Sequence, residues 1–293
     1  MIYQRPLAYL LALEGVALLR AHAGEHDDEF IAARIAEIRG LLDDPALETN
    51  LVAAGHTDAI TGYDVWSATY DQPGNSLFDV ERPILREIVD PLPAGAALDA
   101  ACGTGRLTEY LAGLGHGVIG VDGSPGMLAH ARTRLPDTDF RPGDLGALPV
   151  DDDSVDLVVC ALALTHVPDL APAIAEFARV LRPGGHLVIS DCHQELVALG
   201  SMPRVRLASG EPVFLPSFRH RASDYLSAAL PAGFTVRRCA EPRRPVAGLP
   251  AKRYEGGNWD GWPWSLLDIV PEAHQAAFDG TPALVIWHFQ LAG

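Results

Sequence analysis

Hydrophobic and polar positions follow two different patterns through the middle of the chain. Short, nearly continuous apolar runs are typical of buried parallel strands, and apolar residues three or four positions apart are typical of helices packed on them. The apolar runs predict strands near residues 96–101, 117–121, 138–141, 155–162 and 185–190. The intervening stretches predict helices near residues 83–90, 104–115, 125–134 and 171–182. This alternation predicts an α/β fold built on a doubly wound, mainly parallel sheet.

The pattern loosens beyond Asp191. It predicts one more helix, over 222–230, and two more strands, over 235–240 and 283–291, which brings the sheet to seven strands. Two segments without clear periodicity remain, 194–221 and 241–282, and both are expected to be irregular.

The N-terminal part has a purely helical pattern. Residues 5–44 contain two apolar stripes separated by the polar break Gly24–Glu29, which predicts a helical hairpin. Residues 45–60 are expected to be a linker, so that 1–60 form an N-terminal extension and 61–293 the main domain. A hairpin must bury its stripes, and we expect it to cap its own domain or, preferably, to form a homodimer contact.

Composition is consistent with one large core. The chain has 293 residues, of which 48% are hydrophobic, and no run approaches the roughly 18 apolar residues of a membrane span. The first apolar stretch resembles a secretory signal, but Glu14 interrupts it and Arg5 is the only positive charge before it, which favours an amphipathic helix. The four cysteines contain no C-x-x-C pair, which disfavours a zinc site and fits free thiols in a reducing cytoplasm.

Charge is strongly acidic overall and uneven along the chain. The formal net charge of -16 disfavours nucleic acid as a partner. Residues 194–255 run against this trend, with ten Arg or Lys against five acids. This segment is either a solvated face or part of a pocket for an acidic acceptor.

The stretch Leu98–Arg106 joins the first predicted strand of the core to a helix through a glycine turn. A dinucleotide fingerprint, G-x-G-x-x-G, fails because Thr108 stands at the third glycine position, and a P-loop fails because no lysine is near. Asp99 at the strand end would repel a pyrophosphate and suits a ligand with a positive charge. Asp122, at the end of the next strand, can accept hydrogen bonds from both hydroxyls of a ribose.

This turn resembles motif I of the class I S-adenosylmethionine-dependent methyltransferases, D/E-x-G-x-G-x-G. It reads DAACGTG here, with Ala101 in place of the first glycine. The resemblance extends over residues 60–191 through Asp122-Gly123-Ser124, Gly143-Asp144-Leu145, the run Val155 to Leu164 and Arg182–Gly185. It implies a Rossmann-like methyltransferase domain whose last strand enters antiparallel, S-adenosyl-L-methionine as cofactor and, by its natural-product group, a place in secondary metabolism.

The resemblance also implies a set of cofactor contacts. The methionine part would meet Asp99 and the turn from Gly103 to Gly105, and Ala101 is a further expected cofactor contact. The ribose would meet Asp122, the adenine Gly123, Met127, Asp144 and Leu145, and the sulfonium Ala161 and Leu162. The segment Thr61–Asp71 resembles Y-D-x-W-A-x-x-Y-D, whose aromatics close over the cofactor in this family. Tyr63 and Tyr70 are seven residues apart, about two helical turns, so both can face one way.

The expected reaction is methyl transfer to a small molecule, most often to oxygen, next to carbon or nitrogen. A hydroxyl acceptor needs a base, and histidine is the usual choice. His166 stands in a sequence that is frequent in this superfamily, which favours a structural role, whereas His193 follows the fifth strand, where acceptors often lie. His220 is a third candidate. No metal is expected, and segments 194–221 and 241–282 would form the acceptor pocket.

Three tryptophans, Trp259, Trp262 and Trp264, lie within six residues of one another. They either pin a loop to the sheet or form a lid over an apolar, aromatic acceptor. Two alternatives to methyl transfer stay open: a non-catalytic scaffold that binds the cofactor, and a cofactor-dependent cyclisation or rearrangement.

Overall fold

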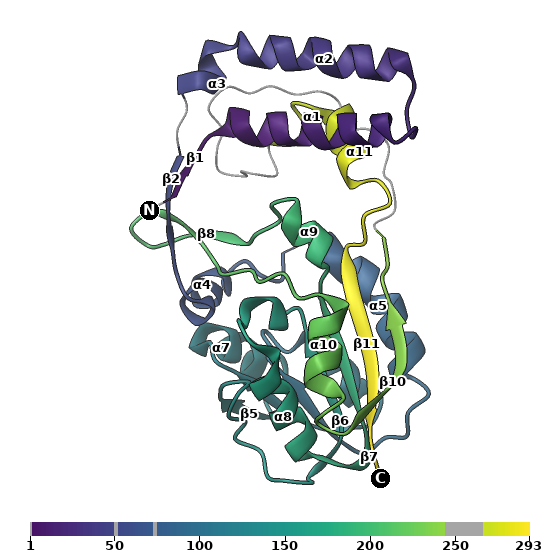
Figure 1. The fold of residues 1–293 in the computed structure, drawn as a ribbon. Helices are drawn as coiled ribbons and strands as arrows, with labels where there is room; N and C mark the ends of the chain where they lie inside the picture. Colours follow the sequence, from purple (N-terminus) through teal and green to yellow (C-terminus); the bar gives the residue numbers. More distant parts are fainter. Residues whose placement is uncertain (1, 50–51, 73–74, 244–265) are drawn as a thin grey trace. The chain divides into compact units, whose positions relative to one another are not determined.

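The computed structural model describes residues 2–49, 52–72, 75–243 and 266–293 (Figure 1). The described residues form two compact units. One contains residues 2–55 and 266–281, and the other contains residues 56–243 and 282–293.

The larger unit is built on a seven-stranded sheet. Its order is β10-β11-β7-β6-β3-β4-β5, and β11 runs antiparallel to both of its neighbours. The strands are β3 (Ala96–Ala100), β4 (Gly117–Asp122), β5 (Asp139–Pro142), β6 (Val155–Ala161), β7 (Leu181–Cys192), β10 (Phe234–Ala240) and β11 (Leu284–Leu291). The predicted doubly wound sheet and the antiparallel entry of its last strand are therefore confirmed.

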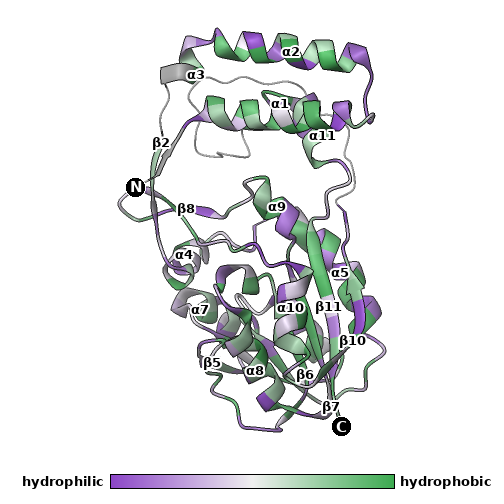
Figure 2. Ribbon diagram, in the orientation of Figure 1, coloured by the Kyte–Doolittle hydropathy of each residue, from purple (hydrophilic) through white to green (hydrophobic). Residues whose placement is uncertain are grey.

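Helices cover both faces of this sheet (Figure 1). Helices α5 (Ser76–Val89) and α6 (Arg106–Gly113) share one apolar cluster with the strands, and α8 (Leu170–Val180) and α10 (Ala222–Ala229) share the cluster on the other face. The strands between them are hydrophobic over most of their length (Figure 2), as expected when both faces of a parallel sheet are buried. Helix α7 (Pro125–Arg134) has the predicted bounds, because Ser124 caps it and Pro125 opens it.

Strand β7 begins earlier than predicted. A helix was predicted near 171–182 and a strand near 185–190, but α8 ends at Val180 and Leu181 already pairs with Val155. A register shift between Val155 and Leu157 absorbs the extra residues of β7.

Residues 194–221 were expected to be irregular, and this is wrong. They contain α9 (Gln194–Ala198), β8 (Arg204–Arg206) and β9 (Pro212–Phe214), and the two strands form an antiparallel hairpin. Each element is too short to show a hydrophobic period, which is why the sequence pattern missed them. Part of the expected linker is also ordered, since α4 (Ala59–Trp66) begins within it.

The smaller unit contains the predicted helical hairpin, α1 (Pro6–His22) and α2 (Asp28–Leu42). It also holds α3 (Pro45–Thr49), a short antiparallel pair of β1 (Ile2–Gln4) and β2 (Val52–His56), and α11 (Pro271–Phe278). Segment 241–282 was expected to be irregular and to belong to the main domain. Its described end instead contains α11, which lies against α1 in the smaller unit.

A buried ionic cluster joins the helices of the smaller unit. Arg34 on α2 contacts Glu14 on α1, Glu37 on α2 and Glu272 on α11. Glu14 and Arg34 are almost fully buried, whereas Ile35 and Leu42 on the expected apolar stripe of α2 are exposed. The ion pair lies among buried apolar residues of the two helices, so hydrophobic spacing alone did not predict that these two charged residues face inward. The homodimer contact stays a prediction.

None of the helices in the described residues is both long and apolar enough to cross a lipid bilayer.

Candidate active site

A cavity of about 610 Å³ opens at the carboxyl ends of β3, β4, β5 and β6 in the larger unit. This is the edge where open α/β sheets bind ligands, beside the point where the strand order reverses between β3 and β6. Most residues expected from the sequence line it: Tyr63, Tyr70, Ala101, Gly103, Asp122, Gly123, Met127, Asp144, Leu145, Ala161, Leu162 and His166.

Asp122 is held in place by the glycine turn and by the start of α7. Its Oδ2 accepts the Gly103 N–H at 2.8 Å and its Oδ1 accepts the Ser124 N–H at 2.8 Å. Burial raises the pKa of the Asp122 carboxyl, and the backbone hydrogen bonds act in the opposite direction. Each carboxylate oxygen can accept a second hydrogen bond, so the group can still receive two donors from a ligand.

The turn before Asp122 leaves open space beside the cavity. Ala101 and Gly103 have positive φ angles of 61° and 54°, and a Cβ on Gly103 would meet no protein atom within 4 Å. A ligand can therefore approach the Gly103 backbone closely.

Two of the expected contacts lie beneath the turn and do not line the cavity. Asp99 is 1% exposed, and its Oδ2 accepts a 2.6 Å hydrogen bond from the Thr108 hydroxyl. Burial raises the pKa of Asp99 to about 6. Gly105 has a φ of 84° and begins α6, where a Cβ would lie 3.3 Å from Ala131 Cβ. Both residues shape the turn from below.

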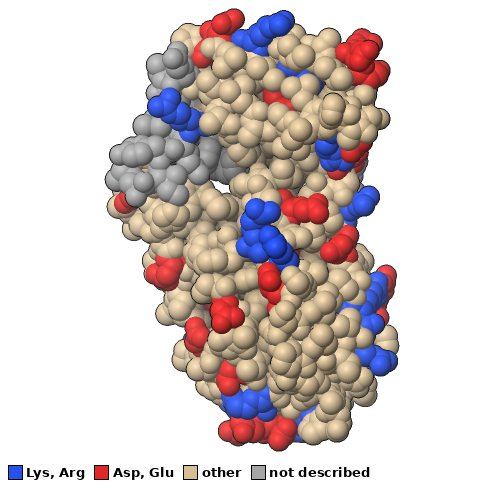
Figure 3. Space-filling view, viewed as in Figure 1, with Lys and Arg blue, Asp and Glu red and all other residues tan. Residues whose placement is uncertain are grey.

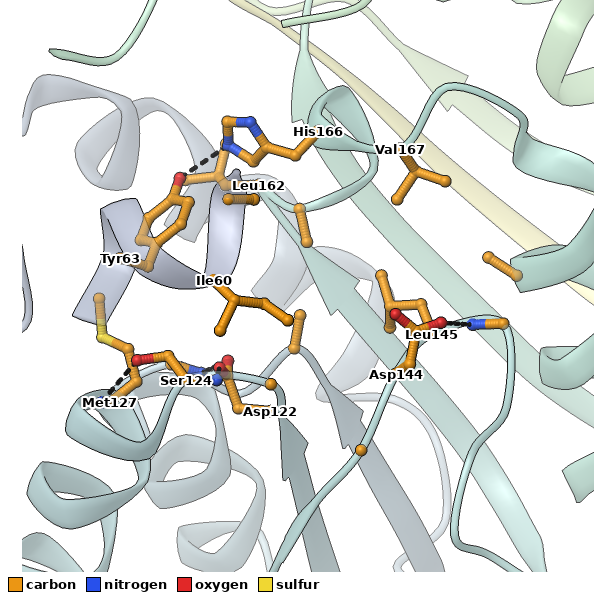
Figure 4. A pocket seen from close by; sticks show the side chains of 18 of the residues that line it. Ile60, Tyr63, Asp122, Ser124, Met127, Asp144, Leu145, Leu162, His166 and Val167 are labelled. Atoms are coloured by element: carbon orange, nitrogen blue, oxygen red, sulfur yellow. Dashed lines mark hydrogen bonds between the residues drawn. The ribbon is translucent and has the colours of Figure 1, made fainter. Parts of the chain in front are cut away.

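The loop after β5 forms the opposite side of the cavity. Asp144 Oδ1 accepts the Gly146 N–H at 2.8 Å, and Figure 4 shows Asp144 beside Leu145, across the cavity from Asp122. The lining residues that the structure describes include four carboxylates (Asp58, Asp122, Asp144 and Asp169) and neither lysine nor arginine. On the molecular face in Figure 3, by contrast, basic side chains lie beside acidic ones. The cavity therefore has an electrostatic preference for a cation.

Tyr63 and Tyr70 both line the cavity, but the expected reason is wrong. Helix α4 ends at Trp66, so two helical turns do not separate the two residues, and Tyr70 follows in a turn. Their ring centroids are 5.9 Å apart in an edge-on arrangement. Asp64 anchors this segment to the start of α7, since its Oδ1 accepts the Gly126 N–H at 2.6 Å. Asp71 anchors its other end by accepting from the Thr104 hydroxyl at 2.7 Å.

His166 ends a single 3₁₀ turn, η1 (Leu164–His166), that follows β6. Its Nε2 lies 2.8 Å from the Tyr63 hydroxyl, as Figure 4 shows, and its Nδ1 lies 2.5 Å from the Pro216 carbonyl oxygen. Burial lowers the pKa of His166 below its usual value, so the ring is neutral at pH 7.

The other two histidine candidates lie elsewhere. His193 is 4% exposed and does not line the cavity; its Nδ1 accepts the Glu195 N–H at the start of α9. His220 Nε2 lies 2.8 Å from the Val167 carbonyl oxygen, in a neighbouring groove. His166 is thus the one candidate base that lines the described cavity.

Sequence reasoning missed several lining residues. Asp58, Ala59 and Ile60 line the cavity but were assigned to a linker. Asp58 is the N-cap of α4 and accepts the Thr61 N–H at 2.8 Å, and an aspartate before a helix is a signal that the sequence offers. Ser124 was quoted only as part of a motif. The segment Val167–Asp169, which directly follows η1, also lines the cavity. Trp259, Trp262 and Trp264 lie outside the described residues.

Comparison with known proteins agrees with this geometry. The methyltransferase domain family matches residues 98–189. A demethylmenaquinone methyltransferase of Renibacterium salmoninarum is 34% identical over 181 residues, which are 62% of this chain and 68% of that protein. A malonyl-[acyl-carrier protein] O-methyltransferase of Yersinia pestis is 32% identical over 151 residues, 52% of this chain and 54% of that protein.

The fold has counterparts among solved structures. An S-adenosylmethionine-dependent methyltransferase from Mesorhizobium loti superposes with a TM-score of 0.51 at 24% identity, over 72% of this chain and 97% of that one. This likeness shows the fold, and the demethylmenaquinone methyltransferase relative and the family match define the class. The chain belongs to the class I S-adenosylmethionine-dependent methyltransferases, and S-adenosylmethionine is its cofactor.

Proposed function

We propose that the cavity at the carboxyl ends of β3 to β6 holds S-adenosylmethionine and that the protein transfers its methyl group to the hydroxyl of a small, neutral, aromatic molecule. The observation that carries this proposal is the charge and shape of one site. A buried carboxylate held by two backbone amides stands beside an open glycine turn, in a cavity whose described lining is acidic and otherwise mainly apolar.

The residues present fit the cofactor. Asp122 has acceptor capacity left for the two ribose hydroxyls, and the open space at Gly103 admits the methionine part. We assign Asp144 and Leu145 to the adenine, with Gly123 and Met127 beside it, because all four line the cavity. We assign Ala161 and Leu162 to the sulfonium, and Tyr63, Tyr70 and Ala101 line the same cavity. When bound, S-adenosylmethionine supplies an activated methyl group with a neutral leaving group.

The protein's own contribution is position and protection from water. Holding an acceptor in line with the methyl group can lower the barrier by roughly 7–11 kcal/mol in the best cases. The Tyr63 and Tyr70 rings, anchored through Asp64 and Asp71, form a wall that excludes water from that line.

The expected acceptor was acidic or aromatic, and the described lining favours the second. An anionic acceptor would stand among four carboxylates without a lysine or arginine in the described lining. A neutral hydroxyl on an apolar ring meets no such repulsion and matches the apolar remainder of the cavity. The relatives are named for different acceptors, one of them an O-methyltransferase, so neither acceptor is carried over. Secondary metabolism and a cytoplasmic location stay predictions.

Labelled transfer tests this function. The protein is incubated with S-adenosylmethionine labelled in its methyl group and with two acceptors of equal ring size, phenol and benzoate. We expect label in methyl phenyl ether and at least about 10-fold less in methyl benzoate, because benzoate brings a charge into an acidic cavity. Equal or preferential labelling of benzoate would contradict the neutral acceptor. Cofactor binding without labelling of either compound would contradict transfer to a hydroxyl.

A further inference from the structure

Tyr63 and His166 form a hydrogen-bonded pair inside the cavity. They come from elements 103 residues apart in the sequence, α4 and η1, and meet at 2.8 Å. Both line the cavity, and Figure 4 shows the pair beside Leu162.

The pair has only one consistent arrangement of protons. The Pro216 carbonyl can only accept, so the Nδ1 of His166, 2.5 Å away, must carry a proton. Because the ring is neutral, Nε2 then has a free lone pair, and the Tyr63 hydroxyl must donate to it. The Pro216 carbonyl thus selects the tautomer with the proton on Nδ1. In this tautomer Nε2 can act as a base, and the Tyr63 hydroxyl lies between it and the cavity.

We propose that Tyr63 and His166 form a proton relay, in which the Tyr63 hydroxyl contacts the acceptor hydroxyl and His166 Nε2 receives the proton. This inference rests on the proposed function, because only an acceptor that loses a proton needs the relay. It assigns Tyr63 a role in the chemistry beyond closing over the cofactor.

The step balances in atoms and charge. The acceptor oxygen forms a bond to the methyl carbon while the carbon–sulfur bond breaks and its electron pair stays on sulfur. The acceptor proton passes to the Tyr63 oxygen as the Tyr63 proton passes to Nε2. One positive charge leaves the sulfur and one appears on the imidazolium, so the site holds the same net charge before and after. The imidazolium later releases its proton to water.

Packing from behind fixes the distance between the two residues. A Cβ on Gly62 would lie 2.5 Å from Leu215 Cγ, so α4 can approach the 215–218 segment only because this position is glycine. Tyr63 packs on the cluster of Val205, Val213 and Leu215. The Phe218 N–H donates to the Thr165 carbonyl at 2.7 Å, which ties the same segment to η1.

The electrostatic surroundings suit a relay with a histidine at its end. Burial raises the pKa of Tyr63 well above its usual value, and the nearby Tyr70, Cys192, Asp191 and Asp122 act in the same direction. Tyr63 therefore stays protonated and cannot itself act as the base. His166 has a lowered pKa, so its Nε2 is free to accept a proton over the whole neutral range.

The first test reads the proton positions without any turnover. A long-range nitrogen–proton correlation spectrum of the full chain in the free state reports the tautomer of each histidine. We expect His166 to be neutral with its proton on Nδ1, and Tyr63→Phe to shift the Nε2 resonance alone. A proton on Nε2, or a charged ring at neutral pH, would overturn the relay.

The second test separates proton removal from positioning. Two variants are compared with wild type, Tyr63→Phe and His166→Gln; the glutamine amide can accept a hydrogen bond near the Nε2 position but cannot take a proton. With phenol at about pH 8.5 we expect kcat to fall about 100-fold in each. 4-Nitrophenol is already ionised at that pH, so repulsion by the carboxylates lowers its turnover in wild type and variants alike, and we expect each variant to lose less than about 3-fold relative to wild type with this acceptor. Tyr110→Phe and His130→Asn, which alter groups on α6 and α7 away from the cavity, serve as controls that retain wild-type turnover.

The outcomes are distinct. Equal losses with both phenols would show that Tyr63 and His166 only position the acceptor, and would overturn the relay. If wild type methylates phenol and both variants keep the same kcat, the relay is overturned and the proposed function still stands. Cofactor binding by wild type with no turnover of either phenol would contradict the proposed acceptor class, and the relay with it.

Discussion

The two sides of the cavity are assembled in different ways. The side expected to hold the cofactor is made by loops that directly follow β3, β4 and β5, and its main contact joins Asp122 to Gly103, 19 residues away. The other side joins α4, η1 and the 215–218 segment, whose contacts span 103 and 50 residues. Local geometry therefore fixes the first side, whereas long-range packing fixes the second. A substitution can damage one side and spare the other.

The largest effect on this comparison is expected from Gly62→Ala. The new Cβ would lie 2.5 Å from Leu215 Cγ, which must push α4 away from the 215–218 segment and separate Tyr63 from His166. We expect kcat to fall by about 10- to 100-fold, stability to fall by about 1–3 kcal/mol, and cofactor affinity to change less than about 3-fold.

Leu215→Val in the Gly62→Ala background is the matched rescue, because it removes a methylene from the clash. Recovery of most of the lost kcat is expected in steady-state kinetics. Loss of cofactor affinity in step with kcat would show that the two sides are not separable.

The same contrast explains how far the sequence could predict the site. Asp122, Gly103 and Asp144 follow strand ends, so an apolar run and a glycine turn were enough to place them at one edge. The pairing of His166 with Tyr63 depends on Pro216, two residues after β9, and the β8–β9 hairpin that leads to it is too short to show periodicity. For that reason the sequence left His166, His193 and His220 open, and the structure brings only His166 into the described cavity.

A second prediction concerns the base of the glycine turn. Burial raises the pKa of Asp99 from 3.8 to about 6, so the folded state binds its proton more tightly than the unfolded state does. Its stability contribution is therefore present below pH 3.8 and is lost as pH rises toward 6. Asp99→Asn removes this loss and should stabilise the free protein by about 2–3 kcal/mol at about pH 8.

Denaturant unfolding at several pH values checks this prediction. The advantage of Asp99→Asn should shrink as pH falls from about 7 to about 4. A constant difference between the variant and wild type over that range would contradict an ionisation effect at Asp99.

A smaller effect is expected from Gly126→Ala, at the start of α7. Its Cβ would lie 2.6 Å from Ser67 Oγ and 2.8 Å from Asp64 Oδ1, the atom that accepts the Gly126 N–H. The α4 segment should shift slightly, with about 1 kcal/mol lost in stability and a few-fold rise in the acceptor KM. Ala129→Gly, on the exposed side of the same helix, controls for helix propensity. An unchanged KM would show that Asp64 does not position the aromatic wall.

Calorimetric titration of S-adenosylmethionine into wild type, Asp122→Ala and Tyr63→Phe tests the central claim most directly. Asp122 is assigned to the cofactor and Tyr63 to the proton of the acceptor. The account predicts that Asp122→Ala weakens binding by about 1.5–3 kcal/mol, roughly 10- to 150-fold in Kd. It predicts that Tyr63→Phe changes Kd less than about 3-fold. Unchanged affinity in Asp122→Ala, or an equal loss in both variants, would contradict it.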